Sequence, residues 1–461
     1  MANTISFFGA ARTVTGSKHL IETNGKKILV DCGLFQGPRD LRDRNWQPFP
    51  FDPLEIDAVV LTHGHTDHIG MLPKLIRDGY KGPIYCTKAT KGLCDISLPD
   101  SGRLQEEDAY HANKHGSRHS PALPLYTEDD AYRTLKQLKP LTYQDLHALP
   151  GKAQFRYRPA GHILGSAFVE LFFENGERIL MSGDVGRYNS PIIKDPSDID
   201  FTEYLVVEST YGDRLHEPED PKEYLLRAFQ RCANEGGVLL IPSFAIGRTQ
   251  ELLFHLKQLE IEGRLPKIPI YVDSPMATST SALYDRSREE WDAESLEMIQ
   301  AGFEPIEPDG LRYVRDKNQS KALNVQSGPF AVIAGSGMAN GGRILHHLMH
   351  RLDKSSTTVL FVGYQAVETL GRRLLEGAPT VTIFRQEIEV RATIERMTGL
   401  SAHADQGELM RWLHGIKTPP KKTFIVHGEP DVQDIFAAKI REELGWDNVI
   451  VPDQGDSFDL S

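Results

Sequence analysis

His63-Gly64-His65-Thr66-Asp67-His68 places four candidate metal ligands within six residues. The stretch follows the apolar run 56–61, which predicts a short strand that ends in a ligand-bearing loop. Residues two apart in an extended segment face the same way, so His63 and His65 should share one ion, whereas Asp67 and His68 point toward a second. Nitrogen and carboxylate ligands without cysteine favour zinc in an open, catalytic site. A purely structural role is disfavoured, because burying these polar groups without an ion costs free energy.

This cluster resembles the signature of the metallo-β-lactamase superfamily, and three other segments fit the same resemblance. The family implies an acidic residue after an early strand, which Asp31 supplies at the end of the run 26–30. It implies a histidine on a mid-chain loop, supplied by His162, and a bridging aspartate, supplied by Asp184 after the run 179–181. Asp31 alone is more typical of a turn residue after a strand. The four motifs together occur in the expected order, each after an apolar run.

Three later motifs resemble those of the β-CASP branch, which contains nucleic-acid-processing nucleases such as RNase J and the catalytic subunit of the cleavage and polyadenylation machinery. Glu208 ends the run 204–207, His403 lies in Ser401-Ala402-His403-Ala404, and His427 follows the run 424–426. The resemblance extends from about Ser6 to Pro430. It implies an α/β fold, a metallo-β-lactamase αββα sandwich with an inserted α/β β-CASP domain.

The resemblance also implies a set of residue roles. One zinc ion would be held by His63, His65 and His162, and the other by Asp67, His68 and His427, with Asp184 bridging both. Asp31 would orient a ligand without touching the metal. A hydroxide shared by two Zn²⁺ ions would attack the phosphodiester bond, and Asp67 would accept its proton. His403, oriented by Glu208, would protonate the leaving oxygen, giving 5′-phosphate and 3′-hydroxyl ends.

The candidate ligands divide the chain into three parts. They occupy residues 31 to 184 and 403 to 427, whereas the interval between Glu208 and Phe384 carries none. That interval alternates strand-like runs, at 238–242, 268–273, 330–334 and 357–362, with a helical apolar stripe at 247–260. Such alternation predicts a mostly parallel sheet flanked by helices. We therefore expect a metallo-β-lactamase domain at 1–210 and 385–461, interrupted by a β-CASP domain at 211–384.

Candidate phosphate contacts lie in the expected inserted domain. A glycine-rich turn after the strand 330–334 could bind an anion through its backbone N–H groups; its candidate residues are Ser336, Gly337, Met338, Gly341 and Gly342. The resemblance adds Arg248, whose charge at a helix start opposes the helix dipole unless an anion or a salt bridge compensates it. We expect these groups to face the metals across a cleft. Glu368 departs from the family pattern, in which glycine is common, and its role stays open.

Composition indicates an ordinary globular protein, with 40% hydrophobic and 25% charged residues among 461. No apolar run is long enough for a membrane span, and the first residues lack a signal peptide. The four scattered cysteines suit a reducing cytoplasm, with Cys32 and Cys232 expected as buried thiols. A net charge of −12 argues mildly against nucleic acid, but two divalent ions would make the site itself positive.

The expected function is a zinc-dependent ribonuclease acting on single-stranded RNA in RNA processing or decay. RNA is favoured over DNA because the resemblance associates histidine at position 427 with RNA-cleaving members. An endonuclease is favoured over a 5′-exonuclease, although the mode depends on how a 5′ end is bound, which the sequence leaves open. The oligomeric state, including a homodimer, and the metal used in vivo also stay open.

Two alternatives belong to other classes. A binuclear zinc hydrolase of small esters or thioesters would share the first four motifs, but it would need neither the long insertion nor His403. A non-catalytic RNA-binding paralogue would be expected to have lost ligands, whereas all seven are present in this chain.

Overall fold

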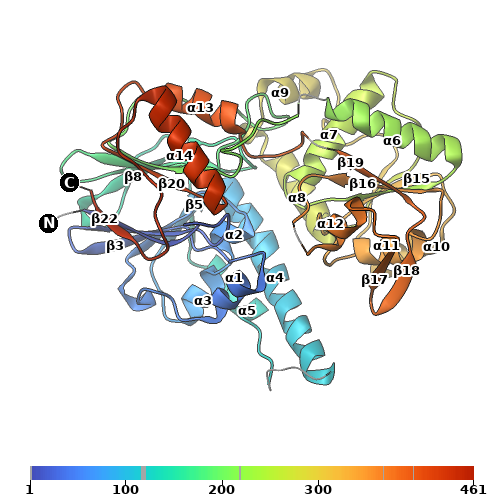
Figure 1. Ribbon diagram of the computed structural model, residues 1–461, viewed down its shortest axis with the longest axis horizontal. Helices are drawn as coiled ribbons and strands as arrows, with labels where there is room; N and C mark the ends of the chain where they lie inside the picture. Colours follow the sequence, from blue (N-terminus) through green and yellow to red (C-terminus); the bar gives the residue numbers. More distant parts are fainter. Residues whose placement is uncertain (1–2, 116–120, 218–219, 367, 398, 461) are drawn as a thin grey trace. The chain divides into compact units, whose positions relative to one another are not determined.

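The computed structural model describes residues 3–115, 121–217, 220–366, 368–397 and 399–460. The chain forms two compact units: the first comprises Met1–Leu215 with His403–Ser461, and the second comprises His216–Ala402. The chain leaves the first unit, builds the second and returns (Figure 1). The sequence analysis expected this return at residue 385. In the structure, strand β19 (Thr393–Met397) still pairs in parallel with β16 (Thr357–Val362), so the second unit extends past that position.

The first unit contains two seven-stranded sheets. In spatial order, the first sheet consists of β22 (Ser457–Asp459), β1 (Thr4–Gly9), β2 (Lys18–Thr23), β3 (Lys26–Val30), β4 (Ala58–Val60), β5 (Ile84–Thr87) and β6 (Leu138–Leu141). The second consists of β21 (Val449–Ile450), β20 (Lys422–Val426), β11 (Tyr204–Glu208), β10 (Arg178–Met181), β9 (Ala167–Phe172), β8 (Gln154–Pro159) and β7 (His147–Ala148).

The two sheets face each other across one core, because alternate residues of each strand point to opposite faces. In β4, Val60 packs into the core between the sheets, whereas Val59 packs against the outer helices. In β10, Met181 faces the same central core and Leu180 faces outward. Strands β4 and β10 are therefore buried on both faces, which explains why their sequences contain continuous apolar runs.

Helices cover the outer face of each sheet, giving the four layers of an αββα sandwich (Figure 1). The helices before the insertion are α1 (Arg39–Asp43), α2 (Thr66–Ile69), α3 (Leu72–Arg77), α4 (Lys88–His115) and α5 (Glu128–Leu135). Those after it are α13 (Gln406–His414) and α14 (Pro430–Leu444). Leu72 and Ala131 pack on the first sheet, whereas Trp412 and Phe436 pack on the second.

The second unit is built on one six-stranded parallel sheet, as the alternating pattern predicted. In spatial order its strands are β14 (Leu311–Tyr313), β13 (Ile270–Val272), β15 (Phe330–Ala334), β12 (Val238–Pro242), β16 and β19. A separate hairpin pairs β17 (Thr380–Ile383) with β18 (Gln386–Glu389). The helices are α6 (Pro221–Glu235), α7 (Arg248–Ile261), α8 (Pro275–Arg286), α9 (Ala293–Gln300), α10 (Lys317–Val325), α11 (Ile344–Arg351) and α12 (Leu370–Leu375). In Figure 1, α6 and α7 lie on one face of the sheet, and α10 to α12 lie on the other.

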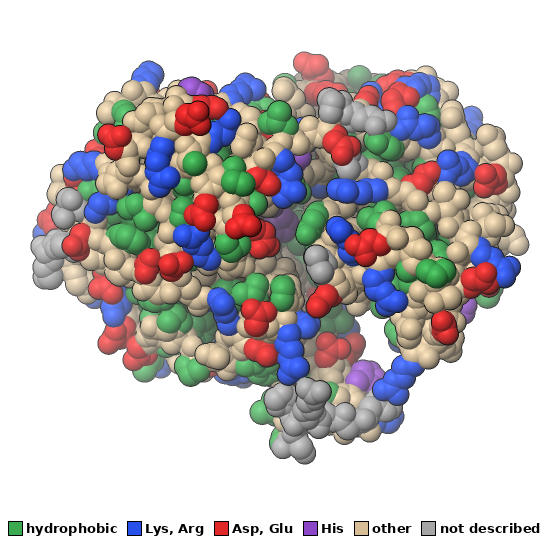
Figure 2. All heavy atoms as spheres, viewed as in Figure 1, with side chains coloured by type: hydrophobic (Ala, Val, Ile, Leu, Met, Phe, Trp, Pro, Cys, Tyr) green, Lys and Arg blue, Asp and Glu red, His purple; other side chains and the backbone are tan. Residues whose placement is uncertain are grey.

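Surface charge is mixed. Among the described residues, Figure 2 shows Lys and Arg side chains interspersed with Asp and Glu side chains on the viewed face of each unit. All four cysteines are buried free thiols, which confirms the expectation for Cys32 and Cys232. Within the described ranges, the helices are all too short or too polar to cross a bilayer.

Candidate metal centre

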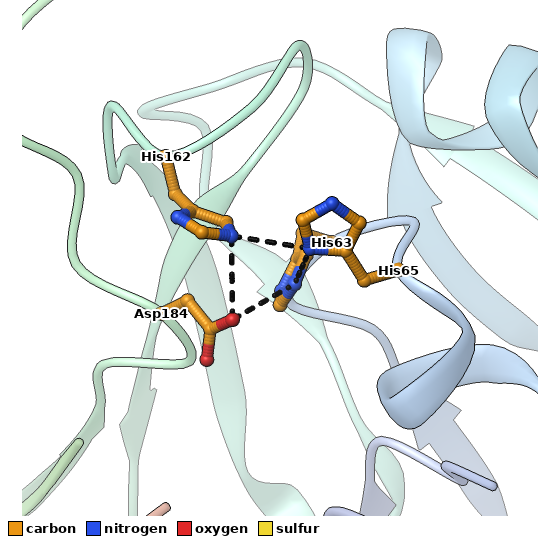
Figure 3. Close-up of side chains that lie close together, drawn as sticks. All are labelled: His63, His65, His162 and Asp184. Atoms are coloured by element: carbon orange, nitrogen blue, oxygen red, sulfur yellow. Dashed lines mark hydrogen bonds and ion pairs between the residues drawn. The ribbon is translucent and has the colours of Figure 1, made fainter. Parts of the chain in front are cut away.

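Four predicted ligands from three separate segments meet in the first unit (Figure 3). His65 Nδ1 lies 3.2 Å from His63 Nε2 and 3.1 Å from His162 Nε2. Asp184 Oδ2 lies 3.3 Å from Nε2 of both His63 and His162. Three ring nitrogens and one carboxylate oxygen therefore converge on one point, as a tetrahedral zinc site requires.

The other predicted ligands form a second group on the opposite side of Asp184. His68 Nε2 lies 3.3 Å from His427 Nε2, and His427 Nε2 lies 3.4 Å from Asp67 Oδ2. Asp184 Oδ1 lies 3.3 Å from His68 Nε2 and 3.6 Å from His427 Nε2. One oxygen of Asp184 thus faces each group, which is the arrangement that a carboxylate bridging two ions would have.

Strand ends bring these side chains together. His63 follows β4, His162 follows β8, Asp184 follows β10 and His427 follows β20. Strands β10, β11 and β20 are parallel neighbours, and β8 runs in the same direction, because β9 pairs antiparallel with both β8 and β10. Their carboxyl ends therefore share one edge of the second sheet. Parallel strands β3 and β4 end on the same side in the first sheet.

The backbone around α2 fixes the position of Asp67 and His68. Cys32 N donates to His68 O at 2.7 Å, and Ser17 N donates to Asp67 O at 2.9 Å. Gly33 permits this approach, because a Cβ atom there would lie 1.5 Å from Asp67 O. Helix α2, which begins within the stretch 63–68, is thus hydrogen-bonded directly to the loop that carries Asp31.

Hydrogen bonds outside the centre orient three of the rings. Asp31 Oδ2 lies 2.7 Å from His68 Nδ1, and Asp31 Oδ1 accepts from Thr62 N at 2.8 Å. Thr62 Oγ1 lies 3.1 Å from His63 Nδ1, and Thr210 Oγ1 lies 3.1 Å from His427 Nδ1. In each case Nδ1 faces outward, which leaves Nε2 for an ion. Neither threonine was predicted from the sequence. The available signal was a hydroxyl residue next to a candidate ligand (Thr62) or near a strand-end acid (Thr210).

The protonation chemistry of the cluster fits bound cations. Burial lowers the pKa of His65 to about 3 and that of His162 well below its usual value, so both rings offer lone pairs at neutral pH. Burial opposes protonation of His68 as well, but the carboxylates of Asp184 and Asp31 raise its pKa well above the usual value. Among the described residues, Asp184 Oδ1 accepts no hydrogen bond although it is buried. A buried carboxylate oxygen needs a partner, and a bound cation would supply one.

His403 and Glu208 lie beside the first group. His403 Nδ1 is 3.0 Å from Glu208 Oε1, whereas His403 Nε2 is 3.9 Å from Asp184 Oδ2. Glu208 is fully buried and also accepts from Val185 N and Thr210 N at 2.7 and 3.1 Å. Burial would lower the pKa of His403, but the negative charges of Glu208 and Asp184 raise it to about 9.

The predicted phosphate contacts lie in the second unit, where each already has protein partners. Arg248 opens α7, and its Nη1 donates to Glu251 Oε2 at 2.6 Å. Its side chain is 10% exposed. Its Nε is buried and has no hydrogen-bond acceptor within the part of the chain that the structure describes. The salt bridge with Glu251 compensates the charge of Arg248 at the start of the helix, and Arg248 Nε makes no hydrogen bond within the described residues.

The glycine-rich turn after β15 is closed by its own serine. Ser336 Oγ accepts from Asn340 N and Gly341 N at 3.1 and 3.2 Å. Gly337 is buried, Met338 is half-buried and Gly342 is exposed with φ 73°. Of the candidate N–H groups, that of Gly341 is therefore already bonded, and Ser336 N also donates, to Gly341 O at 3.2 Å.

Glu368, at the position where glycine is common in the family, has an unusual backbone conformation. Glu368 has φ 69°, in the left-handed region that glycine adopts most readily, and its side chain is exposed. The glutamate thus occupies a backbone conformation that a glycine would favour.

Three family profiles match successive parts of the chain. The metallo-β-lactamase superfamily profile matches residues 14–225, and the Beta-Casp domain profile matches residues 249–374. A profile described as the Zn-dependent metallo-hydrolase RNA specificity domain matches residues 387–452, which contain His403 and His427.

Curated proteins match over nearly the full length. The chain is 41% identical to Ribonuclease TTHA0252 of Thermus thermophilus over 427 residues, covering 92% of this chain and 93% of the relative. It is 30% identical to Transcription termination factor FttA of Methanocaldococcus jannaschii, covering 95% of this chain and 68% of the relative. A crystal structure of a protein of unknown function from Enterococcus faecalis superposes with a TM-score of 0.56 at 15% identity, covering 100% of both chains. That likeness concerns the fold alone.

Proposed function

Because the chain belongs to the β-CASP branch of the metallo-β-lactamase superfamily, we propose that it is a zinc-dependent ribonuclease. The family assignment confirms the predicted fold class, an αββα sandwich with an inserted β-CASP domain. The observation that carries the proposal is the position of Asp184, which has one ligand group at each oxygen and the His403–Glu208 pair beside it.

The donor set supports two zinc ions. His63, His65 and His162 would hold one ion, Asp67, His68 and His427 would hold the other, and Asp184 would bridge them. When bound, the ions would supply a hydroxide nucleophile at neutral pH and stabilise negative charge on the phosphate. Asp31, Thr62 and Thr210 would keep the rings in place through their Nδ1 hydrogen bonds.

Two residues would move protons. Asp67, which extends from the first turn of α2, would accept the proton of the attacking solvent molecule. His403 would donate a proton from Nε2 to the leaving oxygen, while Glu208 holds Nδ1. Glu208 has no freedom to turn away, because two backbone N–H groups also bind its carboxylate.

RNA is the proposed substrate for two reasons. The curated relative with 41% identity is a ribonuclease, and the profile that matches His403 and His427 is described as an RNA specificity domain. We propose that this RNA is single-stranded. Arg248 and the Ser336–Gly342 turn are the proposed phosphate contacts.

Activity of the zinc-loaded protein on matched substrates tests this proposal. The substrates are linear RNA, circular RNA, DNA of the same sequence, and a panel of small esters and thioesters. We expect cleavage of both RNAs, much slower cleavage of DNA, and no ester hydrolysis above background. Cleavage of linear RNA alone would indicate an exonuclease. Hydrolysis of esters without cleavage of either RNA would refute the proposed function.

A further inference from the structure

Two large aromatic side chains in the second unit remain exposed at the same edge of its sheet. Phe244 is 47% exposed and follows β12, whereas Tyr364 is 51% exposed and follows β16. Strands β12 and β16 are parallel neighbours, so their carboxyl ends lie side by side. Exposing an aromatic ring forgoes the free energy of burying it, which makes two such rings at one edge a candidate binding surface.

The glycine-rich turn after β15 touches both of these segments. A Cβ atom at Gly337 would lie 2.8 Å from the ring of Phe244, so the ring rests directly on this glycine. Gln365, which follows Tyr364, donates from Nε2 to Gly337 O at 3.1 Å. Gly371 N also donates to Met338 O at 3.2 Å. The exposed rings thus flank a turn that contains candidate phosphate contacts.

The backbone beneath each ring is fixed while the ring itself is exposed. Phe244 O accepts from Thr249 Oγ1 at 2.7 Å, and Thr249 Oγ1 lies 3.1 Å from Ser243 Oγ. Tyr364 O accepts from Gln365 Nε2 at 3.1 Å, and Gln365 is buried. A ring on a fixed backbone loses little conformational entropy when a flat ligand stacks on it.

One arginine follows each of the two aromatic residues in the sequence. Arg248 lies four residues after Phe244 in the same loop and helix start, and its Nε has no acceptor among the described residues. Arg372 lies eight residues after Tyr364 in helix α12, where its Nε donates to Glu376 Oε1 at 2.6 Å. Aromatic faces next to cationic groups are the combination with which proteins bind single-stranded nucleic acid without sequence preference.

We propose that Phe244 and Tyr364 form a base-stacking platform for single-stranded RNA, in which each ring stacks on one base next to the Gly337 turn. This inference rests on the proposed function, because it takes RNA as the ligand. Stacking would supply affinity that does not depend on salt, in addition to the phosphate contacts. It would also add affinity for RNA in a protein whose net charge is −12.

Binding of a short single-stranded RNA, measured by fluorescence anisotropy at several salt concentrations, tests the platform. Phosphorothioate linkages slow cleavage during the measurement. The variants are Phe244→Leu and Tyr364→Leu, which keep apolar bulk but remove the aromatic face. Phe303→Leu is the matched control, since Phe303 is 39% exposed in the same unit. A second RNA that lacks bases throughout the binding region serves as the comparison, because it offers the rings no base to stack on.

We expect each platform variant to raise the Kd for intact RNA by about 5- to 100-fold with an unchanged salt slope. Phe303→Leu should bind intact RNA with the Kd of wild type. The platform variants should bind the abasic RNA with the Kd of wild type. Equal loss of affinity for intact and abasic RNA, or no loss at all, would overturn the platform. A change in oligomeric state in either variant, seen by sedimentation, would show instead that the rings form an interface between copies of this chain.

Failure of the platform and failure of the proposed function are distinguishable. If zinc-loaded wild type cleaves RNA and both variants bind RNA normally, only the platform is wrong. If wild type cleaves no RNA but the variants lose affinity for intact RNA, the ribonuclease proposal is wrong and the binding surface stands.

Discussion

His403 Nδ1 lies 3.0 Å from Glu208 Oε1 and 3.2 Å from Glu208 Oε2, although the two residues are 195 positions apart in the chain. Glu208 ends the parallel strand β11, whereas His403 opens the segment that returns from the second unit. The pair therefore forms only after the inserted unit has been completed. Its geometry leaves Nε2 of His403 facing the metal centre, where a leaving oxygen would need a proton.

Replacing His403 should impair the chemical step and leave metal binding intact. We expect His403→Ala to retain both zinc ions and its affinity for RNA, while single-turnover cleavage falls by about 10²- to 10⁴-fold, as for the loss of a general acid. Elemental analysis and rapid-quench kinetics check the two halves of this prediction. His414→Ala, on helix α13, is the control. A lost metal, or cleavage within a fewfold of wild type, would show that His403 is a ligand or a packing residue.

Zinc removal should destabilise the first unit. Without cations, the buried carboxylates and imidazoles of the centre are left uncompensated. We expect about two zinc ions per chain in protein purified without chelator, and a lower Tm after dialysis against a chelator. A ligand at 100 times its Kd contributes about 2.7 kcal/mol of stability. A zinc content below one per chain that does not rise when zinc is added would contradict the binuclear centre.

The sequence was sufficient to predict the fold, and the seven candidate ligands that it named lie close together, because the segments that carry them follow strands. Parallel strands bring such positions together at one sheet edge, so order along the chain translates into proximity in space. The contributions of Thr62 and Thr210 could not be predicted, since a hydroxyl beside a ligand points inward or outward according to a local bend. The pairing of β19 with β16 was also missed, because its sequence Thr-Ile-Glu-Arg-Met is half polar.

The glycine-rich turn shows a second limit of the sequence. Glycines after a strand predicted free N–H groups for an anion, but Ser336 Oγ accepts hydrogen bonds from the N–H groups of Asn340 and Gly341. A side chain that bonds to its own turn cannot be distinguished by sequence from one that binds a ligand, because both use the same residue types.

Removing the guanidinium of Arg248 should weaken RNA binding through one phosphate contact. We expect Arg248→Ala to raise the Kd and to reduce the slope of log K against log salt concentration by about 0.7, the value for one phosphate of a single strand. Arg264→Ala is the matched control, since Arg264 is an exposed arginine of the same unit, paired with Glu223. Anisotropy titrations over a range of salt provide both numbers. If both variants change the slope equally, Arg248 has no specific role.

A buried charge network should make the stability of the second unit depend on pH. Asp273 accepts hydrogen bonds from Ser320 Oγ at 2.6 Å and Arg343 Nη1 at 2.6 Å, and it lies 2.7 Å from His347 Nε2. Burial would raise the pKa of Asp273, but these partners hold it below its usual value. The contribution of Asp273 is therefore fully present above the pKa of an unfolded aspartate, about 3.9, and is lost as pH falls through the lower folded-state pKa.

Removing the charge of Asp273 should cost about 3 kcal/mol at neutral pH, as for one partner of a buried ion pair. Hydrogen exchange of the second-unit sheet in Asp273→Asn and wild type measures this difference. Asp285→Asn, at an exposed carboxylate paired with Arg288, should cost almost nothing. The difference between Asp273→Asn and wild type should shrink below about pH 4. A difference that stays constant on acidification would refute the electrostatic explanation.

The chemical ends of the RNA products test the central claim most directly. Wild-type protein loaded with zinc and the Asp184→Asn variant are incubated with RNA labelled at the 5′ or 3′ end, and the new termini are identified. We predict 5′-phosphate and 3′-hydroxyl ends from wild type, and no cleavage by the variant, because Asp184 faces both ligand groups. Products that carry a 2′,3′-cyclic phosphate, or cleavage that persists in Asp184→Asn, would contradict zinc-dependent hydrolysis at this centre.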